Sequence, residues 1–348
     1  MINKKRYLSV FLGLFLMIAL LAACGGNNTG TIEAGNATPN VSDLPEEEIN
    51  NETRSVVHNF GTTDIPANPK RIASINLEDM LLTLDVPLVL ATPILRQDYL
   101  NSDLEQQGAK IESFTDELNF EAVIAADPDL IIASSLLGEE VYSKLSSIAP
   151  TIAYNRSNWR TSIVQIGEAL NLDERAQQVL SDQEAFIAAA KQEVSQLIGE
   201  QPTAAFLRMQ EKDARLFLPS ILSSTTPMSS YVSIVYEGLG WQADPFTLEL
   251  QKANPDKQNA SISLEVLPEV SAEHLFVVTL SSDGSDENLQ KTLDNLLALE
   301  DTAVWGSIPA VIKGNVHVLN MKNWLIEGPK AEQAKLNELI KVLKENIK

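Results

Sequence analysis

Short apolar runs and amphipathic segments alternate along most of the chain. Runs such as Leu130-Ile131-Ile132 are continuous, which is typical of a strand whose two faces are both covered. The segments between such runs place apolar residues at helical spacing. We predict strands over 71–75, 129–133, 151–154, 204–207, 215–218, 274–279 and 316–319, and helices over 77–84, 228–237, 287–299 and 329–347. This alternation indicates an α/β protein with mostly parallel sheets covered by helices.

One segment in the middle of the chain predicts a much longer helix. No Gly or Pro interrupts 173–198, and apolar residues recur there at helical spacing. Asn171 or Asp173 can cap its start, and Gly199 with Pro202 marks its end. About 26 helical residues would span roughly 39 Å, which is longer than one small lobe requires. We therefore expect two α/β lobes joined by one long rigid helix.

The start of the chain has the pattern of an export signal. A basic region that ends at Arg6 is followed by an uncharged, mostly apolar run over 7–23. This run is short for a membrane span, which needs about 20 apolar residues. It ends in Leu21-Ala22-Ala23-Cys24, which resembles the bacterial lipobox. We expect cleavage before Cys24, lipidation of its thiol, and a protein anchored by lipid to the outer face of a bacterial cell membrane.

Composition then divides the mature chain. Residues 24–54 are polar, contain Gly and Pro, and hold almost no large apolar groups, so we expect a lipidated cysteine followed by a disordered tether. The expected organisation is a signal peptide over 1–23, the tether over 24–54, an N-terminal lobe over 55–170, an inter-lobe helix over 171–200 and a C-terminal lobe over 201–348. Cys24 is the single cysteine, which excludes an intramolecular disulfide.

Charge and motif content exclude several classes of function. The net charge is −21, whereas a nucleic-acid binder needs a basic face. The chain has three histidines, too few for a typical transition-metal site, so we expect no metal held directly by protein ligands and no cofactor. The segment Gly238–Ala243 has dinucleotide-binding spacing, but it follows a predicted helix, and Pro245 argues against a helix after it. A nucleophile elbow and a phosphate loop are also missing, so we expect no enzyme.

The two predicted lobes share a local pattern. Asn119-Phe120-Glu121 and Ser263-Leu264-Glu265 each provide a polar cap, an apolar residue and a glutamate before a helical turn and a buried strand. Glutamate is favoured in any first helical turn by the helix dipole, which explains either residue alone. The helix dipole explains less well why both glutamates occur at the same position of the same local motif.

Several segments form a recognisable series along the chain: Gly61–Ile72, Phe120-Glu121 with Asp127–Ala133, Leu145–Ile152, Trp159 ahead of Ile166–Leu170, and Trp324 ahead of Gly328-Pro329. In this order and spacing they resemble the iron-siderophore substrate-binding lipoproteins of ABC importers. The resemblance covers most of the region from about 56 to 345. The family usually has Gly where this chain has Asp85, a residue type that tolerates a left-handed backbone.

This resemblance implies a ligand cleft between the two lobes and a ferric siderophore as the ligand. Loops at the carboxyl ends of strands should line the cleft, with arginines for charge and aromatic rings for flat faces. Arg208 is the strongest candidate, although it could instead pair with a nearby acid, and Trp159 could simply pack its helix on the core. The expected ligand residues are Arg208, Arg96, Trp324, Arg156, Tyr99 and Trp159.

The resemblance also implies partners. Glu121 and Glu265 would each contact a permease subunit of the ABC importer, and the protein would act as a monomer. Haem- or cobalamin-binding lipoproteins of the same fold are the alternative, and an extracellular two-domain α/β hydrolase is a distant one.

Overall fold

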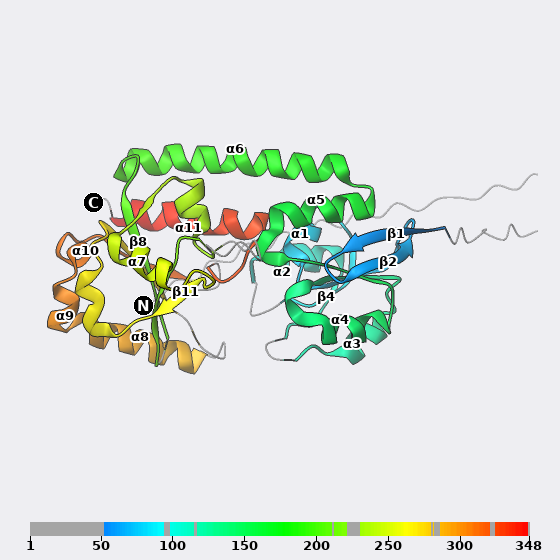
Figure 1. The fold of residues 1–348 in the computed structure, drawn as a ribbon, viewed down its shortest axis with the longest axis horizontal. Coiled ribbons are helices and arrows are strands. Elements are labelled where there is room, and N and C mark those ends of the chain that lie inside the picture. The colour runs from blue at the N-terminus through cyan, green and yellow to red at the C-terminus, as the bar shows by residue number, and fades with distance from the viewer. Residues whose placement is uncertain are drawn as a thin grey trace, which may run out of the picture. The chain divides into compact units, whose positions relative to one another are not determined.

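The computed structural model describes residues 52–93, 98–114, 117–210, 212–220, 230–279, 281, 286–320 and 324–346. These residues belong to one compact unit that begins at Asn50, and they form two lobes (Figure 1). Cys24 and Arg96 lie outside the described residues. The described part contains no helix long and apolar enough to cross a membrane.

The N-terminal lobe is built on a parallel sheet with the strand order β5-β4-β3-β6-β7. Its strands are β3 (Ile72–Ile75), β4 (Leu88–Ala91), β5 (Lys110–Ile111), β6 (Leu130–Ser134) and β7 (Thr151–Tyr154). All residues of β3, β6 and β7 are buried, which explains their unbroken apolar character. The predicted strands and their parallel pairing are confirmed for this lobe.

Helices cover both faces of this sheet. The covering elements are α1 (Glu78–Thr83), α2 (Asp98–Gln107), α3 (Phe120–Ala125), η1 (Ser135–Leu137), α4 (Gly138–Ser146), η2 (Arg156–Asn158) and α5 (Trp159–Leu170). One apolar cluster joins α1, α2 and α5 to one face, and another joins α3 and α4 to the opposite face. Asp85 ends the α1 region at φ 60°, the left-handed conformation expected there, and pairs with Arg175 at 2.9 Å.

The C-terminal lobe has a mixed sheet with the order β11-β9-β8-β12-β13, and β10 also pairs with β8. Its strands are β8 (Thr203–Met209), β9 (Ala214–Phe217), β10 (Gln242–Ala243), β11 (Asn259–Ser261), β12 (His274–Thr279) and β13 (Val316–Asn320). β10, β8, β12 and β13 are parallel, whereas β9 and β11 pair antiparallel at one edge. Mostly parallel sheets in two α/β lobes are therefore confirmed.

The helical elements of this lobe also lie on both faces. They are η3 (Ile234–Gly238), α7 (Pro245–Ala253), η4 (Leu264–Glu269), α8 (Asp286–Glu300), α9 (Ala303–Gly306), α10 (Pro309–Ile312) and α11 (Pro329–Asn346). An aromatic cluster under α11 contains Phe206, Phe276 and Trp324, and a second apolar cluster lies under α8 and α9. Phe206 and Phe276 stack with ring centroids 4.9 Å apart.

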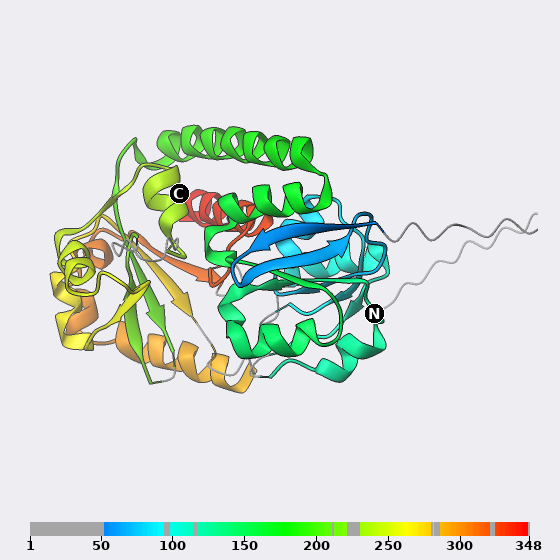
Figure 2. The same ribbon diagram turned by 45° about the vertical axis from the view of Figure 1, so that its right-hand side comes forward.

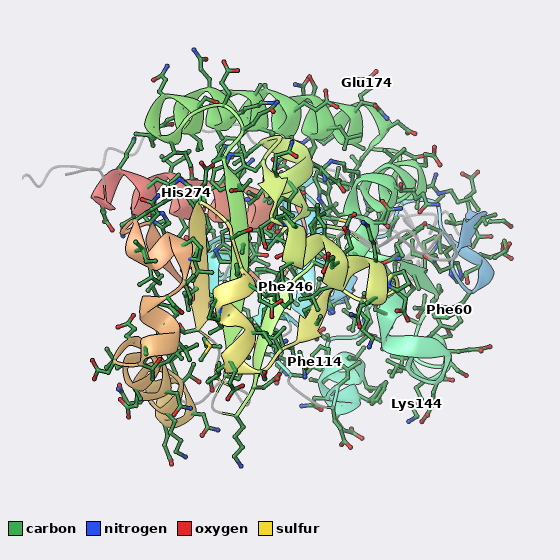
Figure 3. The ribbon with its side chains drawn as sticks, turned by 60° about the vertical axis from the view of Figure 1, so that its left-hand side comes forward. Phe60, Phe114, Lys144, Glu174, Phe246 and His274 are labelled. Carbon is green, nitrogen blue, oxygen red and sulfur yellow. The ribbon has the colours of Figure 1, made fainter. Side chains whose placement is uncertain are left out.

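A single helix, α6 (Asp173–Ile198), runs from one lobe to the other (Figures 1 and 2). Its observed bounds match the prediction from sequence, because the residues that bury it recur at helical spacing. Asn171, at φ 56°, ends α5 just before α6 begins, and Gly167 lets α5 approach α6 closely. Glu174 points away from the body on the outer side of α6 (Figure 3). The long rigid helix between the lobes is thus confirmed.

Three local expectations were wrong or incomplete. The helix expected over 228–237 is a π-helical turn at Ile234–Gly238, and Met228 lies outside the described residues. Pro245 does not prevent a helix but begins α7, since a proline at the first helical position lacks only an N–H that would be unpaired anyway. The strands β1 (Thr53–His58) and β2 (Gly61–Pro66) form an antiparallel hairpin that we had not predicted.

Candidate functional site

Two arginines lie side by side near the carboxyl end of β8. Arg208 on β8 is the direct cross-strand partner of Arg215 on β9. Burial lowers the pKa of Arg208, and the positive charge of Arg215 lowers it further. Its guanidinium donates a hydrogen bond to Gln210, but its Nε finds no acceptor among the described residues. Like charges opposite one another destabilise a sheet, and here Asp213 compensates part of this charge because it pairs with Arg215. The unpaired Nε of Arg208 leaves one donor that an anionic ligand could use.

Arg156 approaches from the N-terminal lobe. It follows β7 and donates from Nη1 to the Asn76 side chain at 2.8 Å. Asn76 ends β3 at φ 62°, a left-handed conformation that asparagine tolerates better than most residues. The Nε of Arg156 is buried and lacks a partner within the described part of the chain. Arg156 is therefore held at the strand ends with one donor still available.

Tyr231 lies within electrostatic reach of both arginines. Burial and the negative charge of Glu327 raise the pKa of Tyr231, whereas the charges of Arg156 and Arg208 lower it. Its backbone carbonyl accepts a hydrogen bond from the buried Lys335 at 2.8 Å. In this fold class, ligands bind at the carboxyl ends of the strands, and Arg156 and Arg208 lie at or near such ends. We had not predicted Tyr231, which follows a segment that the structure does not describe.

Tyr99 lies at the contact between α1 and α11, where the charge of Arg156 also reaches it. Its hydroxyl donates to Asp79 Oδ2 at 2.9 Å. The same carboxylate accepts the backbone N–H groups of Lys330 and Ala331 at 2.9 and 2.8 Å. Asp79 on the N-terminal lobe therefore caps the first turn of α11. The Tyr99 hydroxyl is used in this cap, and burial together with Asp79 holds its pKa well above the usual range.

Burial changes the pKa values of the carboxyl groups at this contact. It raises the pKa of Asp79 to about 6, although its hydrogen bonds from Lys330, Ala331 and Tyr99 act in the opposite direction. Burial likewise raises the pKa values of Glu78 and Glu327. The junction between the lobes therefore contains carboxylates that hold protons more tightly than exposed ones do.

A second buried carboxylate joins the lobes through Trp159. Glu332 on α11 accepts hydrogen bonds from Trp159 Nε1 at 2.9 Å, from both terminal nitrogens of Arg160 at 2.8 Å, and from Gln183 Nε2 at 2.9 Å. Arg160 also lies 4.3 Å over the Trp159 ring. Trp159 is only 1% exposed. The alternative reading, that Trp159 packs its helix on the core, agrees with this position.

Trp324 lies inside the C-terminal lobe. It is fully buried, its ring lies 5.3 Å from that of Phe206, and its indole N–H donates to Glu338 at 3.0 Å. In this structure it presents no surface to a ligand. Of the six expected ligand residues, Arg156 and Arg208 each keep a buried Nε without an acceptor in the described part of the chain, and both act on the charge of Tyr231. Tyr99, Trp159 and Trp324 are used in contacts within the protein, and Arg96 is not described.

The two predicted docking glutamates lie in equivalent places. Glu121 is the second residue of α3, whose start is capped by Asn119, and Glu265 is the second residue of η4. Both are exposed. Glu121 precedes β6, which pairs in parallel with β3, and Glu265 precedes β12, which pairs in parallel with β8. Hydrogen bonds from its own backbone N–H and from Ser263 lower the pKa of Glu265. The local echo read from the sequence is therefore present in the fold.

Metal-binding residue types do not cluster. Within the described ranges, no group of three or more His, Cys, Asp or Glu side chains could hold a metal ion. His274 and His317 lie in contact, with Nδ1 and Nε2 3.1 Å apart, and burial lowers the pKa of His317 to about 4. The segment Gly238–Ala243 runs from a π-helical turn into β10, so its glycines precede a strand where a dinucleotide loop would follow one.

Comparison with known protein families matches residues 96–322 to the family described as periplasmic binding protein. The chain belongs to this family. A comparison with curated proteins finds relatives over nearly the whole chain, and two of them are from Bacillus subtilis (strain 168). One is the probable siderophore-binding lipoprotein YfiY, 26% identical over 93% of this chain and 94% of its own length. The other is the iron(3+)-hydroxamate-binding protein FhuD, 25% identical over 88% of this chain and 87% of its own length.

Solved structures share the architecture of this periplasmic binding protein. Staphylococcus aureus SirA, crystallised with staphyloferrin B, aligns with a TM-score of 0.69 at 24% identity. The alignment covers 84% of this chain and 99% of SirA. This likeness confirms the fold of two α/β lobes.

Proposed function

We propose that this lipoprotein captures a ferric siderophore between its lobes and delivers it to an ABC importer. The observation that carries this proposal is that one arginine from each lobe, Arg156 and Arg208, has a buried Nε without an acceptor among the described residues, and that the charges of both reach Tyr231. Relatives over nearly the whole chain are named for siderophores and for iron hydroxamates, which supports the same ligand class.

The chemistry of the two arginines suits an iron chelate. Each carries a buried Nε that has no acceptor in the described part of the chain. A carboxylate or other anionic oxygen of a chelate would accept these donors, and hydrogen bonds between charged groups are about twice as strong as neutral ones. Because the arginines come from different lobes, one ligand would contact both. Binding would therefore favour the arrangement in which the lobes are together.

Titration of the protein with ferric chelates tests this proposal. Arg208→Ala should weaken binding by about 1.5–3 kcal/mol, the range of a hydrogen bond to a charged group. Arg175→Ala is a matched control, since Arg175 on α6 pairs with Asp85 away from Tyr231. It removes the same charge and should leave the dissociation constant unchanged. Equal affinities in Arg208→Ala and wild type, with equal thermal stability, would remove Arg208 from the site.

A panel of candidate ligands separates the rival functions. Ferrichrome, ferric staphyloferrin B, haem and cobalamin should be tested in the same titration. We expect stoichiometric binding of a ferric chelate without turnover, as in a binding protein and not an enzyme. Tight binding of haem or cobalamin with no response to either ferric chelate would favour the alternative. Chemical conversion of the ligand would favour a hydrolase.

Glu121 and Glu265 provide the proposed contacts with the membrane subunits of the importer. Both are exposed, one on each lobe, so they suit a pair of subunits that each offer a basic residue. The variant Glu121→Ala with Glu265→Ala should bind the chelate normally and take up iron much more slowly. Glu139→Ala with Glu249→Ala removes one exposed glutamate from each lobe elsewhere and serves as the control. Wild-type uptake by the first double variant would contradict the docking role.

Anchoring at the outer face of the cell membrane rests on Cys24 and the lipobox before it. We propose that a lipid on Cys24 holds the protein near the importer as a monomer. Cys24→Ala should lose incorporation of a fatty-acid probe and either remain uncleaved or be shed into the medium. Equal labelling of the variant and wild type would exclude lipidation at this residue.

A further inference from the structure

A hollow lies beside Glu265 on the C-terminal lobe. It has a volume of about 490 Å³ and lies between the β8–β9 turn, the segment before η4, and α8. Met209 and Leu299 form part of its buried floor, which continues into the apolar cluster beneath. Leu264 at its wall is 37% exposed, and Ala298 is also exposed. The hollow is therefore an open pocket with an apolar floor that is continuous with the core. Its lining also includes polar residues, among them Lys212 and Asp213 with opposite charges.

The pocket adjoins a charged residue that faces the solvent. Ser263 and Leu264 line it, and Glu265 follows them directly. The Glu265 carboxylate is fully exposed, and its lowered pKa keeps it ionised at neutral pH. The helix α8, which forms one wall, lies on the side of the molecule opposite α6, as does α3, which carries Glu121 (Figures 1 and 2). A hollow with an apolar floor and an exposed carboxylate thus stand next to each other on the C-terminal lobe.

We propose that this pocket receives an apolar side chain from the importer's membrane subunit, next to the basic residue that contacts Glu265. This inference rests on the proposed docking role. Charge supports this occupant, because a chain of net charge −21 with an ionised glutamate at the pocket favours a basic partner segment. An interface gains most of its binding energy from a few side chains that are buried in well-packed pockets.

The pocket also has a direct link to the ligand site. Gln210 lines the pocket, and its side chain accepts the hydrogen bond from Arg208. Gln210 therefore stands at the border between the pocket and the proposed ligand site.

Filling the pocket tests the inference. Ala298→Trp places an indole in it, and Leu297→Trp adds the same ring one position earlier on α8, where the side chain is 60% exposed. Uptake of radioactive iron from ferrichrome and from ferric staphyloferrin B is measured in cells that carry each full-length variant in place of the native chain. Chelate affinity and thermal unfolding are measured on the same proteins. Ala298→Trp should lower uptake about tenfold or more, the scale of one lost apolar anchor, at unchanged affinity.

The controls separate the possible failures. Leu297→Trp should match the wild type in every measurement. Leu264→Ala removes an apolar side chain from the pocket wall without adding bulk, and it should also lower uptake. This variant tests the inference even if Ala298→Trp fails to fold. Wild-type uptake by Ala298→Trp, or weaker chelate binding by it, would overturn the pocket's role, and the second result would assign the pocket to the ligand. If the native protein binds neither chelate, the proposed function fails and this inference fails with it.

Discussion

The helices α6 and α11 both extend between the lobes, but they are held by different chemistry. α6 packs apolar residues into both lobes, with Ala176 and Val179 in the N-terminal core and Ala190 and Val194 in the C-terminal core. α11 likewise buries leucines in the C-terminal lobe. Its first turn, however, meets the N-terminal lobe through the carboxylates of Asp79 and Glu332.

The difference determines how each contact responds to movement and to pH. Apolar packing is non-directional and changes gradually as surfaces shift. Hydrogen bonds to a buried carboxylate require a narrow range of distance and angle, and leaving one unmade is costly. Relative motion of the lobes would therefore be felt first at the start of α11. Four substitutions or conditions separate the two kinds of contact.

The largest effect is expected from Glu332→Ala. Removal of this carboxylate leaves the buried donors of Trp159 and Gln183, and the half-exposed guanidinium of Arg160, without their shared acceptor. Each buried donor left without a partner costs about 1–3 kcal/mol, so we expect a loss of about 2–6 kcal/mol of unfolding free energy. Glu193→Ala is the control, because it removes an exposed ion pair with Lys344 and should cost about 1 kcal/mol or less. Urea unfolding of both variants measures the difference in unfolding free energy. Similar losses would mean that the Glu332 contacts contribute no more than an exposed ion pair.

The pH dependence of stability should report Asp79. Its pKa is raised from 3.8 to about 6 in the folded protein, so the folded state binds its proton more tightly than the unfolded state. The resulting stabilisation is fully present below about pH 4 and is lost as the pH rises through about 6, up to about 3 kcal/mol. Asp79→Asn should flatten this part of the stability profile. An unchanged slope in the variant would assign the effect to Glu78 or Glu327.

Gly328→Ala should disturb the same contact by steric means. A Cβ at this position would lie 2.4 Å from Asp79 Cγ, and the backbone is at φ 150°, which is strained for other residues. We expect a loss of about 2 kcal/mol in unfolding free energy. At Gly306 in α9, an added Cβ would meet no described atom within 4 Å. Gly306→Ala should therefore leave thermal stability almost unchanged, and an equal loss in both variants would contradict the close approach.

The smallest effect is expected from Tyr99→Phe. This change removes one hydrogen bond to Asp79, for a cost of about 1 kcal/mol. That bond lowers the pKa of Asp79, so its removal should move the midpoint of the pH-dependent step upward. NMR titration of the Asp79 carboxyl carbon would show the shift. A midpoint that moves downward would contradict the direction of the Tyr99 contribution.

The elements that the sequence predicted well are those whose burial is simple. β6 and β12 are unbroken apolar runs because helices cover both of their faces, and α6 shows helical spacing over its whole length. The hairpin of β1 and β2 was missed because its residues are mostly polar and half exposed. The local pattern of apolar and polar residues therefore predicted most of the helices and strands.

The site was less predictable because its parts are distant in sequence. Arg156 and Arg208 could be named from strand ends, and the glutamates of α3 and η4 from their shared frame. Asp79 and Glu332 could not be predicted from sequence, because the residues around each of them are those of an ordinary helix. Each gains its role only from contacts with the other lobe. Trp159 and Glu332 are one example, joined by a hydrogen bond across 173 positions of the chain.

The burial of the aromatic residues gives the protein a built-in optical signal. All four tryptophans are at most 5% exposed, so their emission should be that of rings shielded from water. Trp241, Trp305 and Trp324 lie within the clusters of one lobe, whereas Trp159 donates its indole hydrogen across the junction. Separation of the lobes would break that bond and change the spectrum of one ring among four. Intrinsic fluorescence can therefore follow the opening of this molecule without any attached dye.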